Sequence, residues 1–183
     1  MFEAIFSKIS SGFIAVSLFF LSSYIGNNAR IEELDVVFDD GVVRFSGVLF
    51  DAFENDFEEI FLSGLEVKIV YEVIVYNNKR QVTQSKFTQM VIWDTAYQYW
   101  IIYLDGLDNT LIIDDYIEMV QNFSQFGTDL YFDPDLYETL DFKVTARLED
   151  LYLPTSNNYL KLMLLWNRKV PEGKISVRTR TIK

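Results

Sequence analysis

The chain has 183 residues and a formal net charge of −11, and half of it is hydrophobic, which excludes a disordered tail. It contains neither histidine nor cysteine, so the usual zinc and copper ligands, disulfides, the cysteine nucleophile and the commonest general base are all missing. The acidic balance repels phosphate and excludes DNA and RNA as partners. We therefore expect no cofactor and no nucleic acid.

The first feature along the chain is an uncharged, largely apolar segment, Ile9–Ala29, which follows Lys8. As a helix its 21 residues would rise about 31 Å, just enough to cross a bilayer. Residues 1–29 are therefore predicted to be a signal peptide or a transmembrane anchor; a buried helix of the domain is the remaining alternative. Cuts after Ser23, Gly26 or Ala29 each lack a small residue at position −3, which favours the uncleaved anchor.

Residues 30–183 are expected to form one β-rich domain outside the cytoplasm, periplasmic and either held at the inner membrane or secreted. Two segments alternate apolar and polar residues with period two, Val67–Tyr76 and Asp141–Asp150. In the second, the four residues Phe142, Val144, Ala146 and Leu148 should face the core. The other expected strands are Glu33–Phe38, Val42–Phe50, Val82–Trp93, Tyr97–Leu104, Leu160–Trp166 and Lys174–Ile182. Eight strands with short connections predict an antiparallel β-sandwich. An Ig-like arrangement or an open barrel is the alternative.

Two short helices interrupt these strands. The first has Phe57, Ile60 and Phe61 on one face and stops before Gly64. The second starts after the capping residue Asp115 and is expected to end at Gly127. Each has one apolar stripe, so each should lie on the sheet.

The order of these elements resembles the exported bacterial family catalogued as domain of unknown function 4390. The resemblance covers about Ile31–Trp166 and is carried by Val42–Phe50, the helix ending at Gly64, the turn Trp93–Tyr99, the helix after Thr110-Leu111, and a strand through Phe142–Leu148 that reaches Leu153-Pro154. It implies an extracytoplasmic β-rich domain whose function is not established, and it supplies no catalytic residues.

Charged groups suggest no metal site. An EF-hand needs oxygen ligands at fixed positions and glycine at the sixth; counting from Asp133 places Glu138 at the sixth, so that loop fails the pattern. Solvated turn carboxylates are the simpler interpretation, with an irregular calcium site left open. The segment Lys161–Lys183 has a net charge of +6, which could meet anionic lipid headgroups or balance the acidic remainder of the domain.

The aromatic residues are the best remaining indication of a site. Five of them crowd one predicted hairpin: Trp93, Tyr97, Tyr99, Trp100 and Tyr103. Because its return strand is apolar on both faces, that strand is either covered on both sides or exposes an adhesive patch. We expect a binding domain of the cell envelope whose partner is another envelope protein. The alternative is a carrier of a small apolar ligand or lipid, with its cavity between sheet and helices. An enzyme is the third class, and no catalytic constellation supports it.

Overall fold

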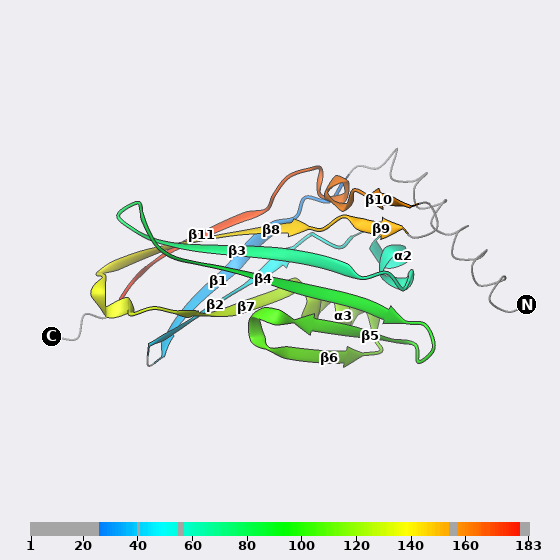
Figure 1. The fold of residues 1–183 in the computed structure, drawn as a ribbon, viewed down its shortest axis with the longest axis horizontal. Coiled ribbons are helices and arrows are strands. Elements are labelled where there is room, and N and C mark those ends of the chain that lie inside the picture. The colour runs from blue at the N-terminus through cyan, green and yellow to red at the C-terminus, as the bar shows by residue number, and fades with distance from the viewer. Residues whose placement is uncertain (1–25, 40, 55–56, 154–156, 180–183) are drawn as a thin grey trace, which may run out of the picture.

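A computed structural model describes residues 26–39, 41–54, 57–153 and 157–179 of the chain (Figure 1). Residues 1–25 of the predicted N-terminal segment lie outside the described residues. Residues 26–29, the end of the predicted helix Ile9–Ala29, are described and are not helical, so the helix was predicted too long at this end. Within the part that is described, no helix has the length and apolar character needed to cross a bilayer.

The fold is mainly β, as predicted, and consists of antiparallel sheets that form a half-barrel, with two α-helices among the described residues. The strands are β1 (Arg30–Asp39), β2 (Val42–Phe50), β3 (Val67–Asn77), β4 (Arg80–Asp94), β5 (Tyr99–Leu104), β6 (Asn109–Ile113), β7 (Gln125–Tyr131), β8 (Thr139–Leu148), β9 (Leu151–Leu153), β10 (Asn158–Leu160) and β11 (Glu172–Arg178). The helices are α2 (Phe57–Leu62) and α3 (Tyr116–Ser124), and the 3-10 turns are η1 (Asp105–Leu107), η2 (Pro134–Leu136) and η3 (Leu162–Trp166).

Two sheets enclose the core. The larger has six strands in the order β11-β8-β3-β4-β5-β6, and the smaller has the order β1-β2-β7; β9 and β10 pair separately. Aromatic rings join the sheets: Phe45 of β2 stacks on Phe142 of β8 with centroids 5.6 Å apart, and Tyr71 of β3 stacks on Phe126 of β7 at 4.6 Å. The half-barrel is therefore filled by side chains from both sheets.

The predicted core register is confirmed. Phe142, Val144, Ala146 and Leu148 are buried, and so is every second residue of β3 from Val67 to Val75. Burial of one face and solvation of the other requires this register, because a one-residue slip would turn the whole set outward.

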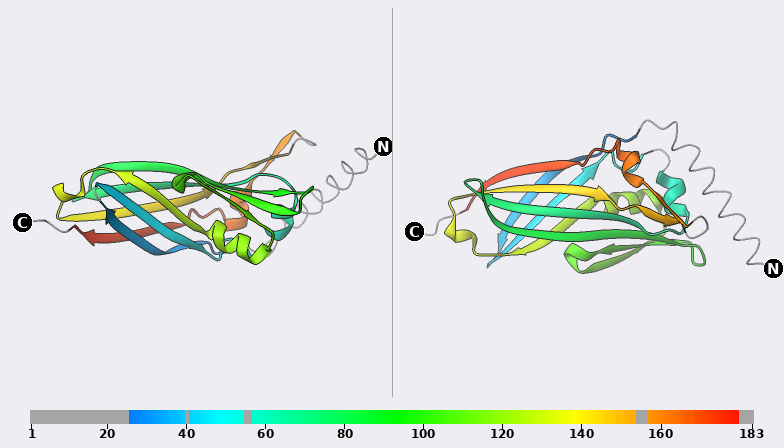
Figure 2. Two further views of the ribbon diagram at one scale, coloured as in Figure 1. Left: turned by 90° about the horizontal axis from the view of Figure 1, so that it is seen from below. Right: turned by 45° about the horizontal axis from the view of Figure 1, so that its top comes forward.

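Both helices are found where they were expected, and they pack against one end of the sandwich (Figure 2). Phe57, Ile60 and Phe61 of α2 are buried, and Gly64 has φ +74°, as a glycine that ends a helix should. The Asp115 side chain caps α3 by accepting a hydrogen bond from the Glu118 amide at 2.8 Å.

Two predicted elements were wrong in detail. The segment Leu160–Trp166 is mostly the 3-10 turn η3, in which Leu162 and Leu165 are buried three residues apart. Helix α3 ends at Ser124, and Gly127 lies inside β7. An added Cβ at Gly127 would come within 3.0 Å of Leu107, so glycine there permits close approach and does not end the helix. Strands β6, β7, β9 and β10 were not anticipated.

Candidate functional site

The predicted aromatic hairpin is formed by β4, a turn at residues 95–98, and β5. Trp93 pairs with Trp100 across the two strands, with ring centroids 4.3 Å apart, on the face directed at the core. Trp100 also packs 5.8 Å from Tyr116 of α3 and is only 4% exposed. It is therefore a core residue and lies outside any partner surface; Trp93 is half-buried beside it.

The opposite face of the hairpin is uncovered. Tyr99, Ile101 and Tyr103 of β5 point outward, and the register places Ile92 of β4 and Ile112 of β6 on either side of Ile101. Together with Met90, which is opposite Tyr103, these side chains form what we call the outer strip: Met90, Ile92, Tyr99, Ile101, Tyr103 and Ile112. Tyr103 is 39% exposed and Ile112 67% exposed. The return strand is thus covered on one face and open on the other.

Tyr97 extends the outer strip at the turn. The Asp94 carboxylate accepts hydrogen bonds from the backbone amides of Ala96 and Tyr97, at 2.9 and 3.1 Å, and Gln98 has φ +58°. The Tyr97 ring stacks on Tyr99 with a centroid distance of 5.8 Å and remains 74% exposed. An ordered turn therefore holds an exposed aromatic pair, which lowers the conformational entropy lost on binding.

The outer strip ends at a free sheet edge. Within the described part of the chain, β6 pairs with β5 on one side and with no strand on the other. The strand itself carries no charge, while the exposed residues Asp108 and Asp114 flank it. Charges placed at an edge are a known way to discourage pairing with a second copy of the same strand. Sequence reasoning missed Ile112, although the run Leu111-Ile112-Ile113 after Asn109 was a strand signal.

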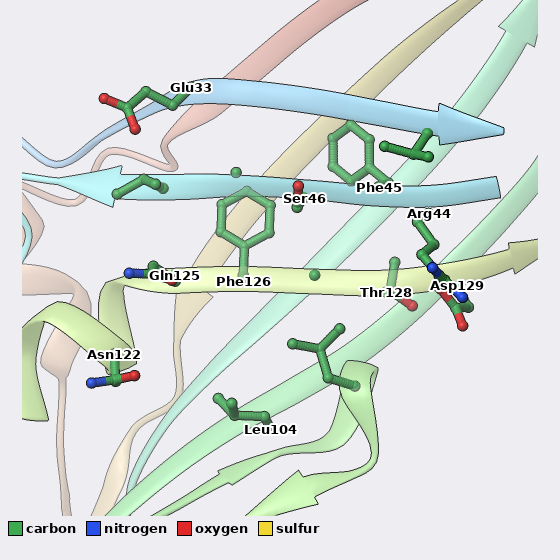
Figure 3. A pocket seen from close by; sticks show the side chains of 15 residues that line it. Glu33, Arg44, Phe45, Ser46, Leu104, Asn122, Gln125, Phe126, Thr128 and Asp129 are labelled. Carbon is green, nitrogen blue, oxygen red and sulfur yellow. Dashed lines mark ion pairs between the residues drawn. The ribbon is translucent and has the colours of Figure 1, made fainter. Parts of the chain in front are cut away.

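A second candidate is a hollow of about 560 Å³ over the smaller sheet, lined mainly by residues of β1, β2 and β7, with η1, β5 and α3 at its margin (Figure 3). Ser46 and Gly127, opposite each other in the register, contribute small groups to its lining. Arg44 and Asp129 lie at one side, with Nε and Oδ1 3.6 Å apart, and Glu33, in the β1 bulge with φ +50°, lies at another. Arg44 also pairs with Asp39, so the cation at this side of the hollow is already held by two carboxylates.

The region between the sheets and the helices, where a carrier would hold its ligand, is occupied by phenylalanine rings. Phe53 packs 5.2 Å from both Phe57 and Phe123, and Phe61 packs 5.9 Å from Phe123. Trp166 packs against Phe53 of this cluster, and its indole N–H donates a hydrogen bond to the Ala52 carbonyl at 2.9 Å.

In the part of the chain that the structure describes, the side chains whose pKa is clearly shifted form no acid–base pair in a pocket. A hydrogen bond from Lys143, followed by one from Lys174, lowers the pKa of Glu172, and its bond to Glu172 raises the pKa of Lys143. Both groups lie on the exposed face of the larger sheet and keep their charges at neutral pH, the opposite of what acid–base catalysis uses. Burial, with a smaller effect of the Glu58 charge, raises the pKa of Tyr116 to about 12, so this phenol stays neutral.

The acidic turns act structurally. Asp133 accepts a hydrogen bond from the Asp135 amide at 3.0 Å, and Asp141 accepts one from the Ser176 hydroxyl at 2.6 Å. Among residues 26–39, 41–54, 57–153 and 157–179, no three acidic side chains are placed so that they could hold a metal ion.

Comparison with known proteins finds no matching family model, no matching curated protein and no matching solved structure. The resemblance to the domain of unknown function 4390 therefore stays a prediction.

Proposed function

We propose that this chain is an interaction module of the bacterial cell envelope that binds another envelope protein through the outer strip. The observation that carries the proposal is the exposed apolar face of β4, β5 and β6 in a chain whose net charge is −11. An acidic protein that leaves Ile112 and Tyr103 in water beside a free strand edge bears a surface of the kind that partners cover.

The residues of the outer strip suit that role. Tyrosine loses little entropy on binding, and the pair Tyr97–Tyr99 is already stacked. The rigid framework beneath consists of paired strands, so the strip requires no rearrangement before it can bind. A carrier receives less support, because aromatic rings fill the space that its ligand would need.

The proposed location is outside the cytoplasmic membrane, with an uncleaved anchor. The sequence predicts residues 9–29 for this anchor; because Gly26 and Asn27 are hydrogen-bonded to the domain, we propose the shorter segment 9–25, whose 17 residues are at the lower limit for crossing a bilayer. Asn27 is buried, and its side chain donates to the Ala52 and Glu54 carbonyls at 3.1 Å each. A cut after Ala29 would remove these bonds, so among the cuts considered it fits this domain least well. A cut after Ser23 or Gly26 would release the same domain as a secreted protein.

The test places a photo-crosslinking amino acid at Ile112 or Tyr103 in living cells, with Tyr131 as the control. Tyr131 is 76% exposed but lies on β7, in the smaller sheet. We expect one protein of defined mass to be crosslinked from both strip positions and not from Tyr131. In isolated membranes, an excess of the purified full-length chain in detergent should compete for this partner and reduce the yield of the crosslink. Crosslinks of equal yield from Tyr131, or none from the strip, would show that the surface lies elsewhere.

A further inference from the structure

The point at which the chain enters the domain is held firmly. The Asn27 amide donates to the Leu165 carbonyl at 2.7 Å, and the Asn167 side-chain amide donates to the Gly26 carbonyl at 2.8 Å. The Asn27 side chain in turn bonds to the Ala52 carbonyl, which also accepts from Trp166. Residues Gly26 and Asn27 are thus bound to η3 on one side and to the segment before α2 on the other.

Gly26 shows how close this contact is. A Cβ added there would come within 2.7 Å of the Asn167 side chain and 2.9 Å of the Leu164 carbonyl oxygen, so no larger residue fits without movement. The apolar segment in the sequence ends at Ile25. No length of free linker therefore separates that segment from the first residue fixed to the domain.

Several exposed apolar side chains lie at the same end of the molecule as this entry point. We call it the entry end: Gly26–Asn27, α2, the turn at residues 95–98, the β9–β10 hairpin and η3, all at the right in Figure 1. Tyr152 and Tyr159 are exposed and lie 5.3 Å apart on the hairpin. Tyr97 and Leu62 are exposed at the turn and at the end of α2. Tyrosine, apolar at its ring and polar at its hydroxyl, suits the boundary between lipid and water.

Two cations stand next to the entry point. Asn167 and Arg168 both have positive φ, +52° and +59°, a conformation held by backbone hydrogen bonds from Asn167 to Leu164 and from Arg168 to Met163. This tight bend leaves Arg168 and Lys169 exposed directly after the residue that binds Gly26. Basic side chains beside an anchor can reach lipid phosphates.

We propose that the entry end rests on the lipid headgroups of the membrane, with Tyr152 and Tyr159 in the interface and Arg168 and Lys169 beside the anchor. Tyr97, which belongs to the partner surface, lies close to the headgroups at the same end. The inference depends on the uncleaved anchor of the proposed function. A short connection confines the entry end to the bilayer surface, and the tyrosines stabilise contact with it. Exposed Glu58 and Glu59 on α2 would be repelled by anionic lipid, so we expect docking on zwitterionic phosphatidylcholine without any need for acidic lipid.

The experiment uses the absence of cysteine from the whole chain, because one substitution then gives one labelling site. Full-length protein, its intact N-terminus verified by mass, is reconstituted into phosphatidylcholine vesicles that contain a headgroup nitroxide lipid as a fluorescence quencher. Fluorophores are placed at Tyr97→Cys or Tyr159→Cys, and for comparison at Tyr131→Cys. Tyr97 and Tyr131 are 74% and 76% exposed, so their labels differ in position and not in accessibility.

We expect labels at 97 and 159 to lose about half of their emission or more. A label at 131, which pairs with Val42 beside the β1–β2 turn and so lies far along the strands from Arg30, should keep most of it. Flotation of the same vesicles on a density gradient shows separately whether the protein is anchored in the membrane. Protein that floats but shows equal quenching at 97, 159 and 131 would overturn the docking of the entry end without contradicting the anchor. Protein that does not float would overturn both.

The variant Asn27→Ala tests the contribution of the entry contacts. It removes the side-chain bonds to Ala52 and Glu54 while leaving the apolar segment intact. We expect flotation to be unchanged and quenching at 97 and 159 to fall toward the value at 131. Unchanged quenching in a variant that retains its fold by circular dichroism would contradict the role assigned to these contacts.

Discussion

The two halves of the larger sheet share one core and differ on their outer face. Across β8 and β11 that face is charged: Lys143 Nζ lies 2.7 Å from Glu172 Oε2, and Lys174 pairs with the same carboxylate at 2.6 Å. Across β4, β5 and β6 the equivalent positions hold the outer strip. A sheet needs only one buried face to fold, and the charged half shows that this sheet tolerates polar residues on the other. The outer strip is therefore more apolar than burial of one face requires, and the proposed partner surface accounts for this difference.

The largest loss of stability should come from a substitution on the buried face of β8, in the charged half of the larger sheet. Val144→Asp would bury an unpaired carboxylate at a site that is fully buried, and we expect it to lower the free energy of unfolding by about 4 kcal/mol or to prevent folding. Thr145→Asp, one residue along on the outer face, lies opposite Glu72 and Glu172 and should lower it by about 1 kcal/mol or less through like-charge repulsion. Denaturant unfolding measures both; equal losses would mean that the register of β8 is wrong.

The next largest loss of stability should distinguish the buried face of β5 from its outer face. Trp100→Ala removes a ring packed on Trp93 and Tyr116 and should cost about 3 kcal/mol, whereas Tyr103→Ala on the outer face should cost about 1 kcal/mol or less. Thermal unfolding followed by near-ultraviolet circular dichroism measures this difference. A larger loss at Tyr103 would show that the outer face is covered in the free protein.

A smaller effect on stability, with a larger one on binding, is expected at the sheet edge. Ile112→Lys places a charge on an exposed position of β6, so the free energy of unfolding should change by about 0.5 kcal/mol or less. Crosslinking from Tyr103 to the envelope partner should nevertheless fall. Ile117→Lys, on an exposed position of α3, is the matched control and should leave the crosslink intact.

The smallest effect concerns pH and the charged half. The pKa of Glu172 lies below its ordinary value of 4.5, so its ionised form stabilises the folded state at neutral pH and this contribution is lost as pH falls through the folded pKa. Its partner Lys143 has a raised pKa, so its contribution is lost only at strongly alkaline pH. Melting temperatures of the wild type and Glu172→Gln should therefore differ slightly at pH 7 and converge below pH 4.5. A gap that widens in acid would reverse the sign of this linkage.

Local patterns were sufficient where one periodicity dominates. The alternation in β3 and β8 fixed which side chains are buried, and the spacing of Phe57, Ile60 and Phe61 located α2. Patterns failed where two structures fit one pattern. The apolar run at Leu162–Trp166 suits a buried strand or a tight helical turn equally, and only its packing against Ala52 and the entry point selects the turn.

For the candidate site, the sequence determined that β5 is apolar on both faces and that aromatic residues gather around it. It could not assign those residues to a surface, because the exposure of a strand face depends on what the rest of the chain lays against it. The tertiary structure decided this: α3 covers the face that bears Trp100, no described element covers the face that bears Tyr103, and the pairing of β6 with β5 brings Ile112 alongside. A period of two separates the faces of a strand, and only the order of strands and helices in space determines which face meets water.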